Sequence, residues 1–346
     1  MLSLSVLAAV ALSWALTPAV RALALHFGAV DQPTGGRKVH KKSTALWGGL
    51  ATGLVVLLSI VFVSLVLDDV GVPAWQLTGF ALGIVILMIG GLLDDRWNLP
   101  PWAQFLFPLA AGVIVVLTGS GIERITNPGG GAPIELGWIG VPLSILWLLT
   151  VTFAMKLLDG LDGLVAGLTV VGAVLIALLA GSEAYFQPMI AMLALLVAGA
   201  YLGFLPHNRE GNIFLGEAGS TIAGFSLGVL AILSGAKVAT AATALAIPLV
   251  DVAIVVIRRL MAGRSPFRGD TEHLHFQLLA LGLRPRTVAR LIWGVGAAAG
   301  LLALTLQTRG KIFLFIFLAA LVCTASYLAW ARGRGRGRGE GSFFDV

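Results

Sequence analysis

Residues 44–67 read TALWGGLATGLVVLLSIVFVSLVL, a run of largely apolar side chains that contains no charged residue. A helix of about 20 such residues crosses the hydrocarbon core of a bilayer with every backbone polar group satisfied inside the segment. Ten further stretches are similarly apolar and are separated by Gly, Pro and charged residues. The eleven expected helices lie near residues 2–22, 44–67, 73–93, 102–121, 138–157, 163–181, 187–205, 219–235, 238–258, 287–305 and 311–331. The sequence therefore predicts an all-α polytopic membrane protein.

The composition excludes a water-soluble domain. Hydrophobic residues make up 58% of the 346 and charged residues 12%, whereas soluble domains average about 45–50% and about 25%. The continuous apolar runs exclude a transmembrane barrel, whose strands alternate in segments of about 10 residues. Because Cys323 is the one cysteine, the chain forms no disulfide framework and no cysteine metal site. We expect one integral membrane domain, residues 1–331, and an Arg/Gly-rich tail, residues 332–346.

Lysine and arginine are distributed unevenly between the two sides of the expected membrane domain. Eleven spans place 19 of the 23 basic residues on one side and leave Arg124, Lys237, Arg309 and Lys311 on the other. Cytoplasmic loops of membrane proteins carry the excess of basic residues. This predicts an N-terminus outside the membrane, a cytoplasmic C-terminus, and all five histidines on the cytoplasmic side or at its boundary.

Carboxylates lie beside the cytoplasmic ends of two expected spans. Asp94 and Asp95 occur in GGLLDDRW, residues 90–97, and Glu217 occurs in NIFLGEAGST, residues 212–221. Burying an unpaired carboxylate costs several kcal/mol, so each needs a compensating group. Mg²⁺ binds one or two carboxylates together with substrate phosphates, which favours a metal site. The alternatives are a solvated helix end and a carboxylate stabilised by a helix dipole.

The motif LLDGLDGL, residues 157–164, contains two aspartates three positions apart. On a helix, Asp159 and Asp162 would share one face, whereas Gly160 and Gly163 also permit a non-helical turn. Two carboxylates at the end of a long apolar run indicate a site for phosphate and metal. The alternative is a glycine-rich turn in which aspartate caps a helix.

Two basic segments fall on the same expected side of the membrane. They are DQPTGGRKVHKKSTALWGG, residues 31–49, and GRSPFRGDTEHLHFQLL, residues 263–279. Their candidate binding side chains are Arg37, Lys38, His40, Arg264, His273 and His275. Arginine and histidine bind diphosphates, and histidine moves protons near neutral pH. The alternative is a set of positive charges attracted to anionic lipid headgroups.

These motifs, in this order, resemble those of the polyprenyl-phosphate N-acetylhexosamine-1-phosphate transferase family, glycosyltransferase family 4. The resemblance runs from residue 31 to residue 285 through Asp-Gln-Pro and RKVH, GGLLDD, DGLDGL, IFLGEAGS, and GRSPF with HLH. Members of the family start O-antigen, teichoic-acid and related glycans or make the lipid-linked precursor of peptidoglycan. The resemblance implies transfer of a sugar-1-phosphate from a UDP-sugar to polyprenyl phosphate in the plasma membrane, with release of UMP and a requirement for Mg²⁺ or Mn²⁺.

The resemblance also implies a role for each motif. Asp94 and Asp95 match catalytic aspartates beside the lipid phosphate and metal, Asp159 and Asp162 match catalytic aspartates of the nucleotide site, and Glu217 matches a metal-binding aspartate. His273 and His275 match a His-rich loop that contacts the nucleotide sugar. The substrate-binding residues that we expect are these two histidines together with Arg37, Lys38, His40, Lys156 and Arg264. The implied partners are the UDP-sugar, polyprenyl phosphate and membrane lipids. The resemblance leaves a homodimer open, and no nucleic acid is expected.

Five positions differ from the family pattern. Glu217 replaces Asp, Phe153 and Lys156 replace Asn, Gln104 replaces a frequent Lys, and Phe276 replaces a third His. Because a lysine is lost at position 104 and gained at position 156, we hypothesise that Lys156 supplies a phosphate-facing charge from another helix.

Two alternative functions remain open from the sequence. One is a family member that binds lipid or nucleotide without turnover. The other is a secondary transporter, which is expected to carry ionisable residues near span centres; Asp251 is the acid deepest in an expected span. The Arg/Gly tail is low in complexity, and we expect it to be disordered and attracted to anionic headgroups.

Overall fold

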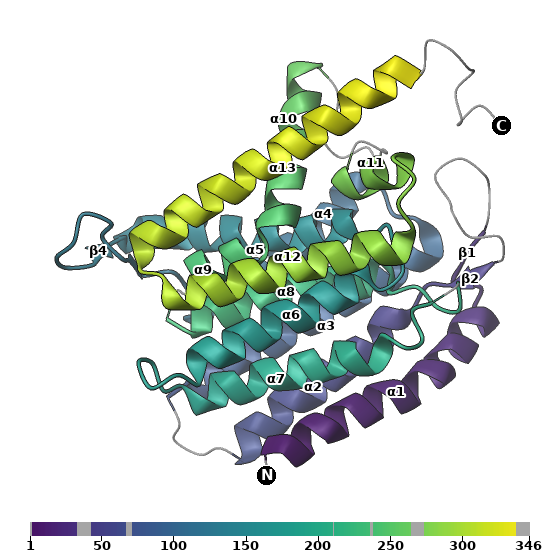
Figure 1. The fold of residues 1–346 in the computed structure, drawn as a ribbon. Coiled ribbons are helices and arrows are strands. Elements are labelled where there is room, and N and C mark those ends of the chain that lie inside the picture. Colours follow the sequence, from purple (N-terminus) through teal and green to yellow (C-terminus); the bar gives the residue numbers. More distant parts are fainter. Residues whose placement is uncertain are drawn as a thin grey trace.

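The computed structural model describes residues 2–32, 43–66, 71–209, 211–235, 238–263 and 273–336, which form a bundle of helices (Figure 1). The helices are α1 (Leu2–His26), α2 (Gly48–Val66), α3 (Ala74–Trp97), α4 (Pro101–Leu117), α5 (Gly140–Leu158), α6 (Leu164–Ala180), α7 (Pro188–Phe204), α8 (Gly216–Leu233), α9 (Val238–Ala244), α10 (Ala246–Met261), α11 (Leu274–Ala280), α12 (Pro285–Thr305) and α13 (Thr308–Arg336). Two antiparallel pairs connect them, namely β1 (Val30–Asp31) with β2 (Thr44–Ala45) and β3 (Arg124–Ile125) with β4 (Ile134–Glu135). A 3₁₀ turn, Gly137–Ile139, precedes α5.

Each of the eleven expected spans corresponds to helical structure in the described residues. Seven of the described helices are long and apolar enough to cross a membrane alone, and α9 with α10 passes the same test only when the bent pair is taken as one span. The helices α4, α6 and α7 are shorter and apolar. The prediction of an all-α polytopic membrane protein is therefore confirmed.

The ninth expected span is not one straight helix. The chain bends by 79° between α9 and α10. Pro248, in the first turn of α10, has no N–H to donate, and its ring would clash with the carbonyl of Ala244 in a continuous helix. The expectation of a single helix over residues 238–258 is wrong at this point, because the proline ends α9 at Ala244.

Two other helices extend beyond their expected ends. The helix α3 continues to Trp97, so the aspartate pair lies within its last turn and not after it. The helix α13 continues to Arg336, five positions into the segment 332–346 that we expected to be a disordered tail. The remainder of that segment lies outside the described residues.

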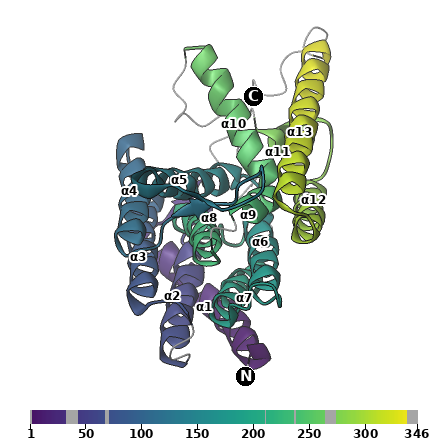
Figure 2. The same cartoon turned by 90° about the vertical axis from the view of Figure 1, so that its left-hand side faces the viewer.

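The central helix of the bundle is α8. It contacts α2, α3, α5 and α6, and Figure 2 shows it enclosed by the bundle, whereas α10 and α13 project away from it. The sequence of α8, GEAGSTIAGFSLGVLAIL, is rich in small residues, which allow membrane helices to approach one another closely. The helix therefore carries Glu217, in its first turn, to a position where several helices meet.

Backbone hydrogen bonds fix the start of α8. Ile213 forms a parallel bridge with Ala45, and the Phe214 N–H donates to the Ala45 carbonyl at 2.8 Å. The Gly49 N–H, in the first turn of α2, donates to the Leu215 carbonyl at 2.7 Å. The IFLGE motif is thus held against β2 and α2 before the chain enters α8.

Candidate functional site

The aspartate pair begins the site, at the end of α3. Asp94 Oδ1 accepts from the Leu99 N–H at 2.8 Å and from Gln104 Nε2 at 2.9 Å. The same Gln104 nitrogen donates to the Leu99 carbonyl at 2.9 Å. Because Pro101 is suited to the first turn of a helix, α4 restarts directly after this connection. Gln104 therefore joins the start of α4 to the end of α3 beside Asp94.

Asp95 contacts the first turn of α8. Its Oδ1 accepts from the Glu217 N–H at 2.9 Å, whereas its Oδ2 is buried and has no hydrogen-bond partner in the described part of the chain. Two glycines permit this approach. Gly216 has a φ of +75°, and a Cβ there would press on the Asp95 carboxyl group, while a Cβ at Gly91 would collide with the backbone of Ala218.

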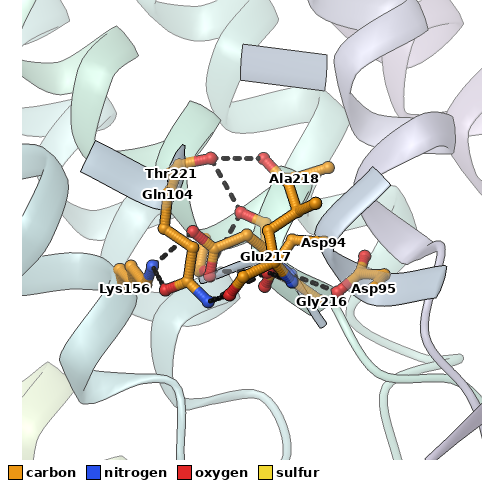
Figure 3. Close-up of polar contacts among 10 residues, drawn as sticks. Asp94, Asp95, Gln104, Lys156, Gly216, Glu217, Ala218 and Thr221 are labelled. Carbon is orange, nitrogen blue, oxygen red and sulfur yellow. Dashed lines mark hydrogen bonds and ion pairs between the residues drawn. The ribbon is translucent and has the colours of Figure 1, made fainter. Parts of the chain in front are cut away.

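Lys156, in the last turn of α5, links α8 to α4 (Figure 3). Its Nζ lies 2.6 Å from Glu217 Oε1 and donates to Gln104 Oε1 at 2.8 Å. Both charged side chains are only 14% exposed. The Nζ also lies 5.6 Å from the ring centroid of Phe153, within cation–π range. Through Gln104, the lysine connects Glu217 to Asp94, so one polar network spans four helices.

The aspartates of DGLDGL lie in a turn between α5 and α6, and the helical alternative is not adopted. Burial, together with the neighbouring carboxylates of Glu217 and Asp162, raises the pKa of Asp159 to about 8, while the Ser220 hydroxyl has the opposite effect. Asp159 therefore lies in the same carboxylate cluster as Glu217, with Asp162 beside it.

Asn208 ties this turn to the start of α8, and the sequence analysis did not identify it. Its Oδ1 accepts from the Gly163 N–H at 2.7 Å, and its Nδ2 donates to the Ile213 carbonyl at 3.0 Å. Asn208 is buried. The one sequence signal is a polar residue shortly after an apolar span, which does not distinguish a buried tether from a solvated loop residue.

The HLH motif is anchored by Asp251 of α10. The His273 Nδ1–H donates to Asp251 Oδ2 at 2.8 Å, and the Leu274 N–H donates to Asp251 Oδ1 at 2.8 Å. Asp251 and His273 are both buried. Asp251, the acid deepest in an expected span, thus has partners within the chain.

His275 packs against the DGLDGL turn. Its Nε2 would lie 2.5 Å from a Cβ at Gly160, so the imidazole fills the space that a side chain there would need. The ring is fully buried and stacks on His273 with 5.8 Å between centroids. Burial lowers the pKa of His275 to about 4, and His273 adds to this effect while Asp251 opposes it. His275 is therefore neutral near pH 7.

The structure brings most of the expected site residues into two adjoining groups. The first group is the cluster of Asp94, Asp95, Lys156, Asp159, Asp162 and Glu217. The second is the histidine pair, which meets the first group at the DGLDGL turn. The other expected substrate-binding residues, Arg37, Lys38, His40 and Arg264, lie outside the described residues.

A small cleft opens between α3, α4 and α8 beside the carboxylate cluster. Its volume is about 10 Å³, room for about one water molecule. Its polar side is lined by Asp94, Gln104, Glu217 and Thr221, and its apolar side by Leu87, Phe107 and Pro108. The cleft therefore places carboxylates next to apolar side chains of α3 and α4.

The carboxylate cluster contains donors of the kind that Mg²⁺ prefers. Asp94, Asp95 and Glu217 supply hard oxygen ligands, and the unpartnered Oδ2 of Asp95 is an acceptor that a cation would satisfy. Over the described ranges, no group of three or more His, Cys, Asp or Glu side chains is arranged to hold a metal ion. Mg²⁺ usually takes one or two carboxylates and completes its shell with water and phosphate. The donor set therefore fits Mg²⁺ bound together with a phosphorylated substrate.

Comparison with known proteins gives one consistent family. Residues 77–235, which include both GGLLDD and IFLGEAGS, match the sequence model of glycosyl transferase family 4. A Bacillus subtilis protein named probable undecaprenyl-phosphate N-acetylglucosaminyl 1-phosphate transferase is 33% identical over 300 residues, covering 85% of this chain and 81% of the relative.

Two further relatives come from other bacteria. The decaprenyl-phosphate N-acetylglucosaminephosphotransferase of Mycolicibacterium smegmatis is 32% identical over 84% of this chain and 79% of its own. The phospho-N-acetylmuramoyl-pentapeptide-transferase of Halalkalibacterium halodurans is 30% identical over 82% of this chain and 90% of its own. Similarity on this scale, together with the ordered motifs, establishes that the chain belongs to glycosyl transferase family 4.

Proposed function

We propose that the chain transfers an N-acetylhexosamine-1-phosphate from a UDP-sugar to polyprenyl phosphate, releases UMP, and so initiates synthesis of a cell-envelope glycan. The names of the relatives, which specify undecaprenyl or decaprenyl phosphate and N-acetylhexosamine donors, support this substrate class. The structural observation that carries the proposal is the cleft, in which Asp94 and Glu217 lie beside apolar side chains of α3 and α4 while Lys156 pairs with Glu217. Such a site suits a lipid phosphate that enters from the bilayer.

The reaction is a phosphoryl transfer between two anions. An oxygen of the lipid phosphate attacks the β-phosphorus of the UDP-sugar, a new P–O bond forms, the bond to the bridging oxygen breaks, and UMP leaves with that oxygen. Such transfers depend mainly on positioning and charge neutralisation. Lys156 contributes a positive charge at the cleft, and Asp159 and Asp162 orient the nucleotide side of the site from the adjoining turn.

Asp94, Asp95 and Glu217 would hold Mg²⁺ or Mn²⁺. When bound, the cation would neutralise negative charge on the diphosphate of the UDP-sugar. His275 is fully buried against the same turn as Asp159, so its expected contact with the nucleotide sugar would require this packing to open, and His273 is oriented by Asp251. We propose that the anionic substrates have further ligands in the chain, namely Arg37, Lys38, His40 and Arg264.

We place the site at the cytoplasmic face of the plasma membrane, with the N-terminus outside. The basis is the excess of Lys and Arg on that side of the eleven spans. Reporter fusions at the two termini test this orientation, since a periplasmic reporter that is active at the C-terminus would contradict it. The mass of the detergent-solubilised protein tests whether two copies associate.

The assay is UMP release from a panel of UDP-N-acetylhexosamines with undecaprenyl phosphate, with and without Mg²⁺. We expect UMP and the lipid-diphospho-sugar when both substrates and the cation are present. Asp95→Asn should abolish the signal, whereas Glu183→Gln, which changes an exposed acid between α6 and α7, should not. Substrate binding without UMP across the panel would identify a non-catalytic member, and solute flux into liposomes without UMP would identify a transporter.

A further inference from the structure

Lys156 and the proposed cation compete for the same carboxylate. The Lys156 Nζ lies 2.6 Å from Glu217 Oε1, and Glu217 is one of the three proposed metal ligands. A second positive charge brought to the same carboxylate group is repelled by the ammonium, and the repulsion is strong where water is largely excluded. The ion pair must therefore weaken or break when Glu217 binds a divalent cation.

Two uncharged neighbours would keep the released ammonium at the cleft. Gln104 Oε1 already accepts from Lys156 Nζ at 2.8 Å, and the Phe153 ring centroid lies 5.6 Å away. Neither group is a ligand that Mg²⁺ favours over a carboxylate. The flexible four-carbon stem of lysine permits a short swing without movement of the helix.

We propose that Lys156 is an exchangeable counter-ion: it neutralises Glu217 before the metal binds, and it turns to a substrate phosphate oxygen when the metal takes its place. The inference deepens the proposed function and rests on it. No covalent bond changes in the exchange, because one ammonium–carboxylate pair is replaced by a metal–carboxylate pair and an ammonium–phosphate pair. In this exchange Lys156 balances the charge of Glu217 while no metal is bound. Once the metal is bound, the ammonium group is available to a substrate phosphate.

The test measures cation affinity without substrate. Mn²⁺ binding to the purified full-length protein in detergent is followed by electron paramagnetic resonance for the parent protein and for Lys156→Gln. Because both side chains are only 14% exposed, removal of the competing ammonium should tighten Mn²⁺ binding by at least about five-fold, the upper end of the range for exposed ion pairs. Equal or weaker binding by Lys156→Gln would overturn the exchange.

A matched control variant and a double-mutant cycle isolate the interaction between Lys156 and Glu217. Lys311→Gln removes a lysine on α13 whose Nζ donates to Thr240 Oγ1 at 2.8 Å, and it should leave Mn²⁺ affinity unchanged. In a Glu217→Gln background, Lys156→Gln should no longer tighten binding; a persistent five-fold effect would contradict a role through Glu217. If Lys156→Gln does not fold, Lys156→Met, which keeps the unbranched stem, gives the same readout.

The second half of the exchange is tested with phosphates. At saturating Mn²⁺, binding of UMP and of polyprenyl phosphate is compared between the parent protein and Lys156→Gln. Weaker binding of one ligand identifies the phosphate that the ammonium meets, and unchanged binding of both overturns this half of the proposal.

The outcomes separate the exchange from the proposed reaction. Tighter Mn²⁺ binding by Lys156→Gln, in a protein that releases no UMP from any donor, would support the exchange and refute the reaction. UMP release by the parent protein, with unchanged Mn²⁺ affinity in Lys156→Gln, would support the reaction and refute the exchange.

Discussion

Asp251 holds His273 and the first N–H of α11 with its two carboxylate oxygens, at 2.8 Å each. The two residues are 22 positions apart, and both are buried. Because a carboxylate only accepts hydrogen bonds, Nδ1 of His273 carries the hydrogen that faces Asp251. Asp251 therefore sets the position and the ring orientation of a histidine in the proposed substrate site.

Asp251→Ala should destabilise the protein and reduce turnover. The change leaves His273 and the Leu274 N–H buried without their acceptor, and breaking a buried pair of this kind costs about 3–5 kcal/mol. Thermal unfolding in detergent and UMP release measure the two effects. Glu183→Ala, at an exposed acid, is the control, and a variant with unchanged stability and turnover would show that Asp251 does not position the histidine.

Lys156→Asn should lower turnover and nucleotide affinity, because it removes the positive charge that links Glu217 to Gln104. We expect a loss of about ten-fold or more, the scale of a charge-assisted hydrogen bond. Unchanged turnover and affinity would refute the idea that Lys156 replaces a lysine missing from position 104.

A lysine swap sharpens this test. Gln104 Nε2 already lies 2.9 Å from Asp94 Oδ1, so Gln104→Lys in the Lys156→Asn background returns an ammonium to the same network from α4. We expect partial recovery of turnover, measured as UMP release. If the swap recovers nothing while the double variant remains folded, the two positions are not interchangeable sources of charge.

The carboxylate cluster could be predicted from the sequence because its members are ionisable side chains at the ends of apolar runs. Asp94, Asp95, Asp159 and Glu217 each needed a compensating group there, and the structure brings them together. The link between Lys156 and Gln104 could also be predicted, because the lysine that is missing at position 104 is present at position 156. These predictions rest on charge, which stands out against a largely apolar chain.

The contacts that hold the motifs together could not be predicted in the same way. Asn208 is a neutral residue in a polar connection, and its two backbone partners lie 45 and 5 positions away. The pairing of Asp251 with His273 depends on the bend between α9 and α10, which a pattern of apolar residues does not encode. Pro248 was the available signal for that bend, since a proline restricts the backbone before it.

Asn208→Ala should destabilise the junction between the DGLDGL turn and α8. The Gly163 N–H and the Ile213 carbonyl would be left buried without a partner, at about 1–3 kcal/mol for each group. Thermal unfolding should shift downward and UMP release should fall with it. Asn208→Asp, which keeps the acceptor for Gly163 but buries a carboxyl group against the Ile213 carbonyl, should destabilise at least as much as alanine. A variant of either kind that is as stable as the parent protein would contradict this account.

Protonation of His275 should destabilise the protein in acid. The pKa of His275 is lowered by burial to about 4 from an ordinary value of 6.5, so the unfolded chain binds this proton at a higher pH than the folded protein does. Stability is then lost as the pH falls from about 6.5 to about 4, by about 3 kcal/mol at 1.36 kcal/mol per unit. His273 and Asp251 are the titratable groups that face His275, and both remain in His275→Gln. Between pH 7 and pH 5, the unfolding temperature of His275→Gln should therefore fall less steeply with pH than that of the parent protein. The control is His26→Gln, at an exposed histidine on α1, whose unfolding temperature should depend on pH as in the parent protein. The same pH dependence in both variants would contradict the role of His275 burial.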